Sequence, residues 1–331
     1  MNKQLTVVIT TFNRENRLIN QLKSLFNQPL YENLHIVVCD NCSDYNVAEV
    51  LSNSFSSKEL TCIEIIKRSF NIGMIGNISS AFLLVKTKWM WLLSDDDETT
   101  QDSIATIIKF IEMYPLIMGL KFTNINDLNR KEYIQTDVGS ISELLFFCKE
   151  NEIDLGNFIF MSNNVYNMEI IKPYLGSAFE YSYSYFPHII PLIIGLNNND
   201  KLKFIPLSIV EYKEPEICAS SNYLVSVYLG AMSINDIPLN LSKKDFDDFR
   251  NFFKMNPFWT VSTDFYNSSY LQKKYLYRKI YKSVFSINGS LKDAVIYRLF
   301  YFQIYIGSNF ISSFFLNLKN IIKKVIVIIK N

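Results

Sequence analysis

The chain is poor in the residues that build zinc modules and disulfide frameworks. Its 331 residues include five cysteines and two histidines, and Cys39-x-x-Cys42 lacks the second half-site that would complete a zinc module. Unevenly spaced cysteines in this number suit a reducing compartment. The sequence has no repeat and no low-complexity linker, and its first residues show neither a basic leader nor a small-residue cleavage site, so we expect no signal peptide. With 49% apolar residues, the chain is expected to fold around a sizeable core.

Apolar, β-branched runs alternate with stretches of helical spacing in the first hundred residues. Four runs are expected to be strands: Leu5–Thr11, Leu34–Asp40, Thr61–Lys67 and Trp89–Leu93. Two helices are expected between them, one carrying Leu18, Leu22, Leu25 and Phe26 on a single face and one over Gly76–Val85. This alternation predicts an α/β fold in which helices cover a mostly parallel sheet. Thr10, Thr11, Asn13, Asp40 and the acids Asp95–Asp97 would then gather along one edge.

Asp95, Asp96 and Asp97 stand where the fourth apolar run ends. Three adjacent carboxylates repel one another, which favours a cation at this position, and hard divalent ions prefer carboxylate oxygens together with the phosphates of a substrate. The alternative is a solvated acidic turn that caps the next helix, because acidic residues favour helix N-termini.

Four motifs in the right order resemble the nucleotide-binding half of the GT-A glycosyltransferases grouped as family 2, which are bacterial enzymes that build polysaccharides. Thr11-Phe-Asn-Arg14 resembles the first nucleotide loop of that family, and Asp40 ends the second strand where the family has an acid. Asn71-x-Gly73-x-x-Gly76-Asn77 resembles the loop that lines the nucleoside, and Ser94-Asp-Asp-Asp97 stands at the place of the Asp-x-Asp metal motif.

The resemblance implies a nucleotide-diphosphate sugar as donor and a divalent metal as cofactor. The implied nucleotide-binding residues are Thr10, Thr11, Asn13, Arg14, Asp40, Asn71, Gly73, Asn77, Asp95 and Asp96. Asp40 would hydrogen-bond the base, usually uracil, and Mg²⁺ or Mn²⁺ on Asp95, Asp96 and Asp97 would stabilise the charge of the leaving diphosphate. Two registers stay open: Ser94 takes the first acid position and Asp96 is the main ligand, or Asp95 and Asp97 form the pair.

The family inverts at the anomeric carbon, which implies a base that accepts the proton of the acceptor hydroxyl. In the family this base is often the second acid of a Glu-Asp pair about ninety residues beyond the metal motif, and this chain has no such pair there. His188 and Glu180 are the candidates in that window, and Pro187 is expected to open a helix beside them. Each residue also has an interpretation without a catalytic role: His188 as a structural hydrogen-bonding histidine, and Glu180 as a solvated loop acid. Asn157–Tyr166 is expected to form a strand and loop facing the acceptor, with Ser162, Asn163 and Asn164 placed to bind sugar hydroxyls or simply to form a turn.

The end of the chain lacks acidic residues. After Tyr266 there are 11 Lys and Arg residues against Asp293 alone, so this tail carries about +10 while residues 1–266 carry about −9. Basic and aromatic residues alternate from Tyr270, and polar residues interrupt the uncharged stretch Leu299–Leu318, which opposes membrane spanning. This composition predicts helices that lie on an anionic membrane surface. The alternative is a helical subdomain that packs on the body or on a second copy of the chain, as a homodimer; the acidic body argues against nucleic acid.

We therefore predict a GT-A catalytic domain over residues 1–230, with a nucleotide-binding half at 1–100 and an acceptor half at 101–230, followed by a helical, membrane-associating region at 231–331. The predicted protein is an inverting glycosyltransferase that acts in the cytoplasm, on the inner face of the cell membrane, on a lipid-linked or growing cell-surface glycan such as capsule or lipopolysaccharide. One rival is a sugar nucleotidyltransferase, although Thr10-Thr-Phe-Asn-Arg14 lacks the glycines of that class. The other is an inactive glycan-binding or scaffolding relative.

Overall fold

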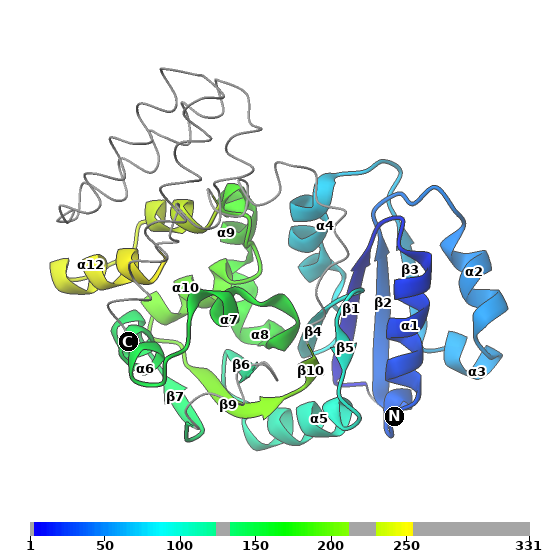
Figure 1. Cartoon of the computed structure of the whole chain (residues 1–331), viewed down its shortest axis with the longest axis horizontal. Coiled ribbons are helices and arrows are strands. Elements are labelled where there is room, and N and C mark those ends of the chain that lie inside the picture. Colours follow the sequence, from blue (N-terminus) through cyan, green and yellow to red (C-terminus); the bar gives the residue numbers. More distant parts are fainter. Residues whose placement is uncertain (1–2, 124–132, 212–229, 254–331) are drawn as a thin grey trace, which may run out of the picture. The chain divides into compact units, whose positions relative to one another are not determined.

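The computed structural model describes residues 3–123, 133–211 and 230–253. Its central element is an eight-stranded sheet with the order β3-β2-β1-β4-β8-β6-β9-β7 (Figure 1). Its strands are β1 (Leu5–Thr11), β2 (Leu34–Asp40), β3 (Ile63–Lys67), β4 (Trp89–Ser94), β6 (Gly119–Thr123), β7 (Thr136–Val138), β8 (Asn164–Asn167) and β9 (Leu202–Ser208). A small antiparallel pair joins β5 (Glu98–Thr99) to β10 (Val210–Glu211).

The four predicted strands form the parallel half of the sheet. Thr11 of β1 lies opposite Asp40 of β2, and Thr10 lies opposite Ser94 of β4. β1, β2 and β4 are buried along nearly their whole length, as expected for β-branched apolar runs covered on both faces. Because these strands are parallel and in register, their carboxyl ends meet at one edge, which is where the candidate site lies.

The other half of the sheet mixes parallel and antiparallel pairs. β8 pairs antiparallel with both β4 and β6, β9 is parallel to β6, and β7 is antiparallel to β9. The predicted strand at Asn157–Tyr166 is shorter than expected, because β8 begins only at Asn164. A helix occupies Leu155–Ile159 instead, since the Asp154 carboxylate accepts a hydrogen bond from the Asn157 amide at 2.9 Å and caps its first turn.

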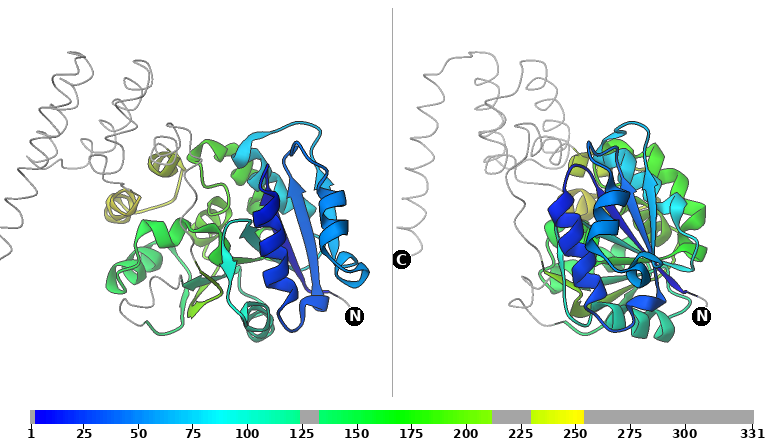
Figure 2. Two further views of the ribbon diagram at one scale, coloured as in Figure 1. Left: turned by 45° about the vertical axis from the view of Figure 1, so that its right-hand side comes forward. Right: turned by 90° about the vertical axis from the view of Figure 1, so that its right-hand side faces the viewer.

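Helices flank the strands. The α-helices are α1 (Glu15–Phe26), α2 (Val47–Ser54), α3 (Ser57–Leu60), α4 (Gly73–Ala81), α5 (Ser103–Met113), α6 (Ile141–Glu150), α7 (Leu155–Ile159), α8 (Met168–Ile171), α9 (Leu175–Glu180), α10 (Ile190–Asn197) and α12 (Lys243–Phe252). The 3₁₀ turns are η1 (Tyr31–Asn33), η2 (Phe82–Leu84), η4 (Met161–Asn163), η5 (Lys172–Tyr174), η6 (Ser182–Ser184) and η7 (Ile234–Asp236). Both views in Figure 2 show α1 running alongside the strands of the parallel half.

Two predicted helix boundaries shift. α4 starts three residues earlier than expected, because Gly73 turns the chain with a φ of +78° and its amide donates to the Asn71 side chain at 2.7 Å. Pro187 does not open a helix: α10 begins at Ile190, with Pro191 in its first turn.

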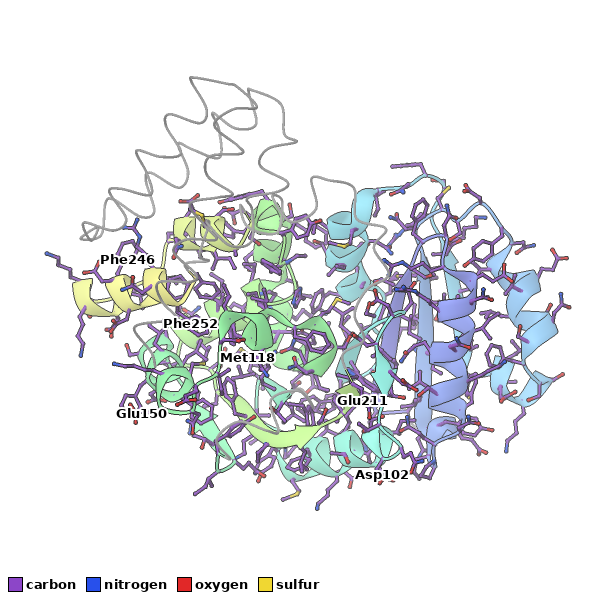
Figure 3. The ribbon with its side chains drawn as sticks, viewed as in Figure 1. Asp102, Met118, Glu150, Glu211, Phe246 and Phe252 are labelled. Atoms are coloured by element: carbon purple, nitrogen blue, oxygen red, sulfur yellow. The ribbon has the colours of Figure 1, made fainter. Side chains whose placement is uncertain are left out.

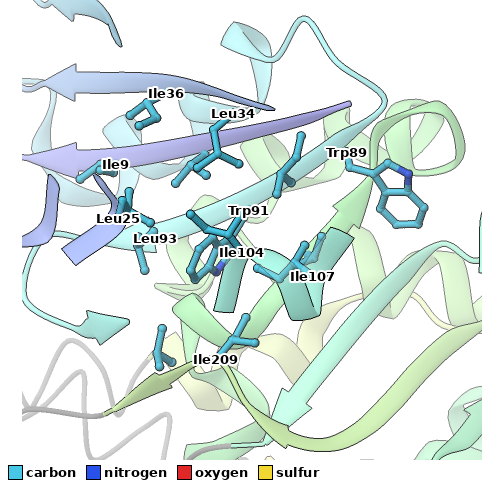
Figure 4. Packing of buried hydrophobic residues seen from close by; sticks show 14 of the residues in the cluster. Ile9, Leu25, Leu34, Ile36, Trp89, Trp91, Leu93, Ile104, Ile107 and Ile209 are labelled. Atoms are coloured by element: carbon cyan, nitrogen blue, oxygen red, sulfur yellow. The ribbon is translucent and has the colours of Figure 1, made fainter. Parts of the chain in front are cut away.

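A hydrophobic core joins α1 and α5 to the same face of the sheet. Ile9 of β1, Leu25 of α1, Trp91 of β4, and Ile104 and Ile107 of α5 are fully buried together (Figure 4). Each such side chain contributes about 1.5–3 kcal/mol by leaving water. The core therefore fixes α1 and the segment after β4 on one side of the sheet, which brings their polar residues together.

The chain divides into two compact units, one formed by residues 1–217 and 236–252 and the other by residues 218–235 and 253–331. Most of the second unit lies outside the described residues, and so does the basic, aromatic tail. The predicted division at residue 230 and the predicted helical tail therefore remain predictions. Within the described ranges, no helix combines the length and the apolar composition needed to cross a membrane.

Candidate functional site

The sheet brings the predicted polar residues of three strands to one edge. Thr11 ends β1, Asp40 ends β2, and Asp95 follows the last residue of β4. All three are buried, with 3%, 0% and 3% of their surfaces exposed. The predicted gathering of donor-site residues is thus present in the described part of the chain, although their roles remain predictions.

Asn13 ties the loop after β1 to the loop after β2. Its backbone is left-handed, with a φ of +53°, a conformation that asparagine tolerates better than most residues. Its amide nitrogen donates to Ser43 Oγ at 2.9 Å, its Nδ2 donates to Asp44 Oδ2 at 2.8 Å, and the Asp44 amide donates back to Asn13 Oδ1 at 2.8 Å. Through these bonds Asn13 connects the loop after β1 to the loop after β2.

Asp40 has one satisfied and one unsatisfied oxygen. Oδ1 accepts a hydrogen bond from the Ser43 amide at 2.8 Å. Oδ2 is buried and receives no hydrogen bond from any residue that the structure describes. A buried acceptor without a donor costs roughly 1–3 kcal/mol, so Oδ2 is positioned to accept an N–H group from a ligand.

The Asn71–Asn77 segment lies against the end of β2. Asn71 Oδ1 accepts hydrogen bonds from Asn41 Nδ2 at 2.8 Å and from the Gly73 amide at 2.7 Å. Asn77 Nδ2 donates to the Cys39 carbonyl at 3.1 Å, while its buried Oδ1 has no partner in the described residues. Asn77 and Asn71 therefore bind Cys39 and Asn41, the two chain neighbours of Asp40, and Asn77 Oδ1 is a second buried acceptor without a described partner.

Two arginines from the start of α1 hold two of the three acids. Arg14 Nη1 donates to Asp95 Oδ1 at 2.8 Å and to Asp96 Oδ2 at 3.0 Å. Arg17, one helical turn later, donates from Nη1 to the same Asp96 oxygen at 3.2 Å. Burial raises the pKa of Asp95, although the positive charge of Arg14 opposes the shift.

Asp97 is held by a hydroxyl. Ser162 Oγ donates to Asp97 Oδ2 at 2.5 Å and accepts a hydrogen bond from the Ser94 amide at 3.0 Å. Burial raises the pKa of Asp97 to about 7, the Ser162 hydrogen bond opposes this, and the neighbouring charges of Asp96 and Asp95 add to it. Asp97 is thus the acid whose negative charge is least compensated.

The carboxylate oxygens of the acid cluster are the kind of ligand that a hard divalent cation prefers. Asp95 Oδ2 is buried and has no hydrogen-bond partner among the described residues, and the pKa of Asp97 is raised because burial and the neighbouring acids disfavour its charge. However, across residues 3–123, 133–211 and 230–253 no three acidic, imidazole or thiol groups converge in the geometry of a metal site. The reason is visible in the contacts, because Asp95 and Asp96 are turned toward arginines and Asp97 toward Ser162.

The two candidate bases have different environments. His188 is 4% exposed, its Nε2 donates to the Ile159 carbonyl at 2.7 Å, and its buried Nδ1 has no partner in the described chain. Burial lowers the pKa of His188 to about 4. Glu180 ends α9 and is exposed. His188 has the contacts of a core histidine, and neither residue is bonded to the acid cluster, so both assignments remain predictions.

A polar cavity of about 850 Å³ borders the acid cluster on the side of α1. Its lining comes from α1, the residues just after it, and the segment from Asp95 to Asp102; Asp102, labelled in Figure 3, is the residue before α5. Its lining residues include Arg17, Gln21 and Gln28 of α1 and the segment after it, but not Asp40, Asn71 or Asn77. The cavity therefore adjoins the predicted metal residues rather than the predicted base-binding residues.

Sequence reasoning did not single out Asn41, and it did not foresee the partner of Ser162. Asn41, missed as a turn residue, holds Asn71 from the end of β2. Ser162 was expected to face sugar hydroxyls together with Asn163 and Asn164, but all three are at most 1% exposed and lie within the fold. Ser162 and Asn163 lie in the 3₁₀ turn η4 and Asn164 begins β8, which agrees with the alternative that this segment forms a turn, while binding of sugar hydroxyls stays a prediction. No local pattern identifies Ser162, since its partner is 65 residues away.

Known proteins resemble this chain in sequence and in fold. Residues 6–170 match the family model described as Glycosyl transferase family 2. TarS 1-349 from S. aureus in complex with UDP-GlcNAc is similar with a TM-score of 0.59 and 12% identity, over 90% of this chain and 86% of that one. The mannosyltransferase PcManGT from Pyrobaculum calidifontis, in complex with GDP-Man and Mn²⁺, has a TM-score of 0.50 and 12% identity, over 89% and 79%. No curated protein sequence matches the chain. The likeness confirms the predicted GT-A fold.

Proposed function

Because residues 6–170 belong to glycosyl transferase family 2, we propose that this protein transfers a sugar from a nucleotide-diphosphate sugar, with UDP as the nucleotide, to a glycan acceptor. The observation that carries the proposal is the buried, unpaired Oδ2 of Asp40 at the same sheet edge as the acids. A carboxylate at that place accepts the imide N–H of uracil. Guanine has its N–H donors at other positions on a larger ring system. The UDP-GlcNAc complex of TarS supports this choice, and the GDP-Man complex of PcManGT makes GDP the alternative to test.

Asp95, Asp96 and Asp97 would hold Mg²⁺ or Mn²⁺, and when bound the ion would neutralise charge on the leaving diphosphate. The chain's own residues do the rest of the donor binding. Asp40 orients the base, and Asn71 and Asn77 form the wall beside it. Ser162 keeps Asp97 turned toward the end of β4. The Mn²⁺ in the PcManGT complex supports a metal-dependent reaction.

We further propose that the transfer inverts the anomeric carbon, with the acceptor hydroxyl losing its proton to a side chain of the chain's second half. His188 has a free nitrogen but a lowered pKa, and Glu180 is exposed at the end of α9. Alanine at the true base should lower transfer by about 10²–10⁴-fold with donor binding unchanged. If both single variants transfer sugar at the wild-type rate, the base is another residue.

The acceptor is proposed to be a lipid-linked or growing cell-surface glycan. The support is the tail after Tyr266, whose charge of about +10 and many aromatics suit peripheral contact with the anionic inner face of a cell membrane. A metal-dependent assay of donor hydrolysis and transfer separates this function from its rivals. A nucleotidyltransferase would instead join a sugar phosphate to a nucleoside triphosphate, and an inactive relative would do neither.

The substitution Asp40→Asn tests the base-reading role. The asparagine Oδ1 still accepts from the Ser43 amide, but an NH₂ group replaces the open Oδ2, so the acceptor for uracil is lost while the loop is kept. We expect UDP affinity to fall by roughly 1–3 kcal/mol in titration calorimetry. Asp248→Asn on α12 is the matched control, because it makes the same charge change at an exposed position. Unchanged UDP affinity in Asp40→Asn, or tighter wild-type binding of GDP than of UDP, would reject the assignment.

A further inference from the structure

Two of the three acids of the candidate metal site are already paired with basic side chains of the chain itself. Arg14 bridges Asp95 and Asp96, and Arg17 adds a second contact to Asp96. Two guanidinium groups thus compensate two of the three carboxylates in the described structure. The third, Asp97, pairs with the hydroxyl of Ser162 and with no basic side chain among the described residues.

The arginine that bridges the acids competes directly with a metal ion. The oxygens that Arg14 holds, Asp95 Oδ1 and Asp96 Oδ2, are ones that a divalent cation would use, and a fixed positive charge at that distance repels the ion. The remaining Asp95 Oδ2 is open, in a side chain that is only 2% exposed. The pocket therefore has the oxygens of a metal site but holds an organic cation on them.

Arg14 is the more exposed of the two arginines and so the better placed to exchange partners. Its side chain is 42% exposed, whereas that of Arg17 is 24% exposed, and it projects from the residue just before α1 rather than from within the helix. Its planar fork of N–H donors pairs bidentately with phosphate as well as with carboxylate. A diphosphate that binds near the acids can therefore replace Asp95 and Asp96 as the anionic partner of Arg14. The two carboxylates then become available to a metal ion.

We propose that Arg14 is a resident counter-ion that occupies Asp95 and Asp96 in the empty enzyme and moves to the diphosphate of the donor, so that metal and donor bind interdependently. The inference rests on the proposed function, because it takes a nucleoside diphosphate as the ligand. It assigns Arg14 two successive partners: it weakens binding of metal alone, and it strengthens binding of the diphosphate. By linkage, whatever factor the nucleotide adds to metal affinity the metal adds to nucleotide affinity.

The test is calorimetric titration of the full chain with two separate probes: Mn²⁺ without nucleotide, and UDP in the presence of EDTA. For Arg14→Gln we expect Mn²⁺ alone to bind about tenfold tighter or more than to wild type, and UDP alone to bind about tenfold weaker or more. Opposite changes in the two affinities distinguish the proposed role from unfolding, since loss of folding would weaken the binding of both Mn²⁺ and UDP. Arg14→Lys keeps the charge, so it should keep Mn²⁺ affinity near the wild-type value. Lys58→Gln, which removes an exposed charge paired with Glu32 outside the site, should change neither affinity.

The outcomes separate this inference from the proposed function. If wild type binds UDP and Arg14→Gln leaves Mn²⁺ affinity unchanged or weaker, the counter-ion role is wrong and the donor assignment stands. If Arg14→Gln and Lys58→Gln tighten Mn²⁺ binding equally, the tighter binding comes from the lower net positive charge of the protein, and the inference also fails. If wild type binds neither UDP nor GDP, with or without Mn²⁺, the proposed function itself is rejected. Thermal unfolding of each variant checks that the fold is intact.

Discussion

Replacing Ser162 with alanine should expose how strongly the acid loop depends on one hydroxyl. Ser162 is fully buried, and its Oγ both donates to Asp97 Oδ2 at 2.5 Å and accepts from the Ser94 amide at 3.0 Å. Above pH 7, where Asp97 is ionised, its hydrogen bond contributes about 1.5–3 kcal/mol, and a buried amide left without an acceptor costs about 1–3 kcal/mol. Since part of the loss is recovered by relaxation, we expect Ser162→Ala to lower the free energy of unfolding by about 2–4 kcal/mol.

Urea unfolding followed by tryptophan fluorescence measures this change. Trp91 reports directly on the region, because its indole Nε1 donates to the Ser162 backbone carbonyl at 2.7 Å, a bond that the substitution leaves in place. With a slope of roughly 2–3 kcal/mol per M, the midpoint should move by about 1 M urea. Ser52→Ala is the control, since its exposed hydroxyl donates to the Glu49 carbonyl within α2 and to no other group in the described ranges. A loss for Ser162→Ala no larger than that of the control would refute the reasoning.

Three further predictions concern pH, metal and the tail. His188 has a pKa of about 4 in the folded chain against about 6.5 unfolded, so its contribution to stability is full above pH 6.5 and is lost as pH falls through 4, by up to about 3 kcal/mol. His188→Gln should therefore reduce the loss of stability between pH 7 and pH 4 in calorimetric melts. An unchanged dependence of stability on pH would show that the imidazole is not neutral in the fold. Asp96→Asn or EDTA should cut sugar transfer by at least about a hundredfold while the melting curve stays cooperative, and full activity in EDTA would count against the metal. Deletion from Tyr270 onward should abolish salt-sensitive binding to anionic vesicles while UDP binding persists; equal vesicle binding by the truncated and full chains would contradict the membrane role.

The first hundred residues were predictable from local sequence because the contacts that form their strands and helices follow from local patterns. β1, β2 and β4 are buried on both faces, so each reads as an uninterrupted apolar run that ends at a polar residue. The spacing of Leu18, Leu22 and Leu25 marks the buried face of α1 directly. Parallel pairing then fixes Thr11, Asp40 and Asp95 at one edge without further information.

The internal contacts of the site could not be predicted in the same way. Arg14 and Asp95 are 81 residues apart, and which cation the acid meets depends on how α1 packs. The Asn157–Tyr166 segment contains asparagines and a serine that suit a turn equally well on the surface or in the core. Burial of Ser162 follows from the antiparallel placement of β8 against β4, a tertiary choice that no period or propensity in the segment records.

The same placement of β8 has a consequence for synthesis of the chain. The partner of β4 on one side, β1, precedes it in the chain, but its partner on the other side, β8, follows about 70 residues later. At about 5–20 residues per second this interval lasts roughly 4–14 s. During it the apolar strand Trp89–Ser94 presents an open edge to other nascent chains. We therefore expect ribosome-bound fragments that end between β4 and β8 to be the species that aggregates or recruits chaperones, and fragments that include β8 to escape both.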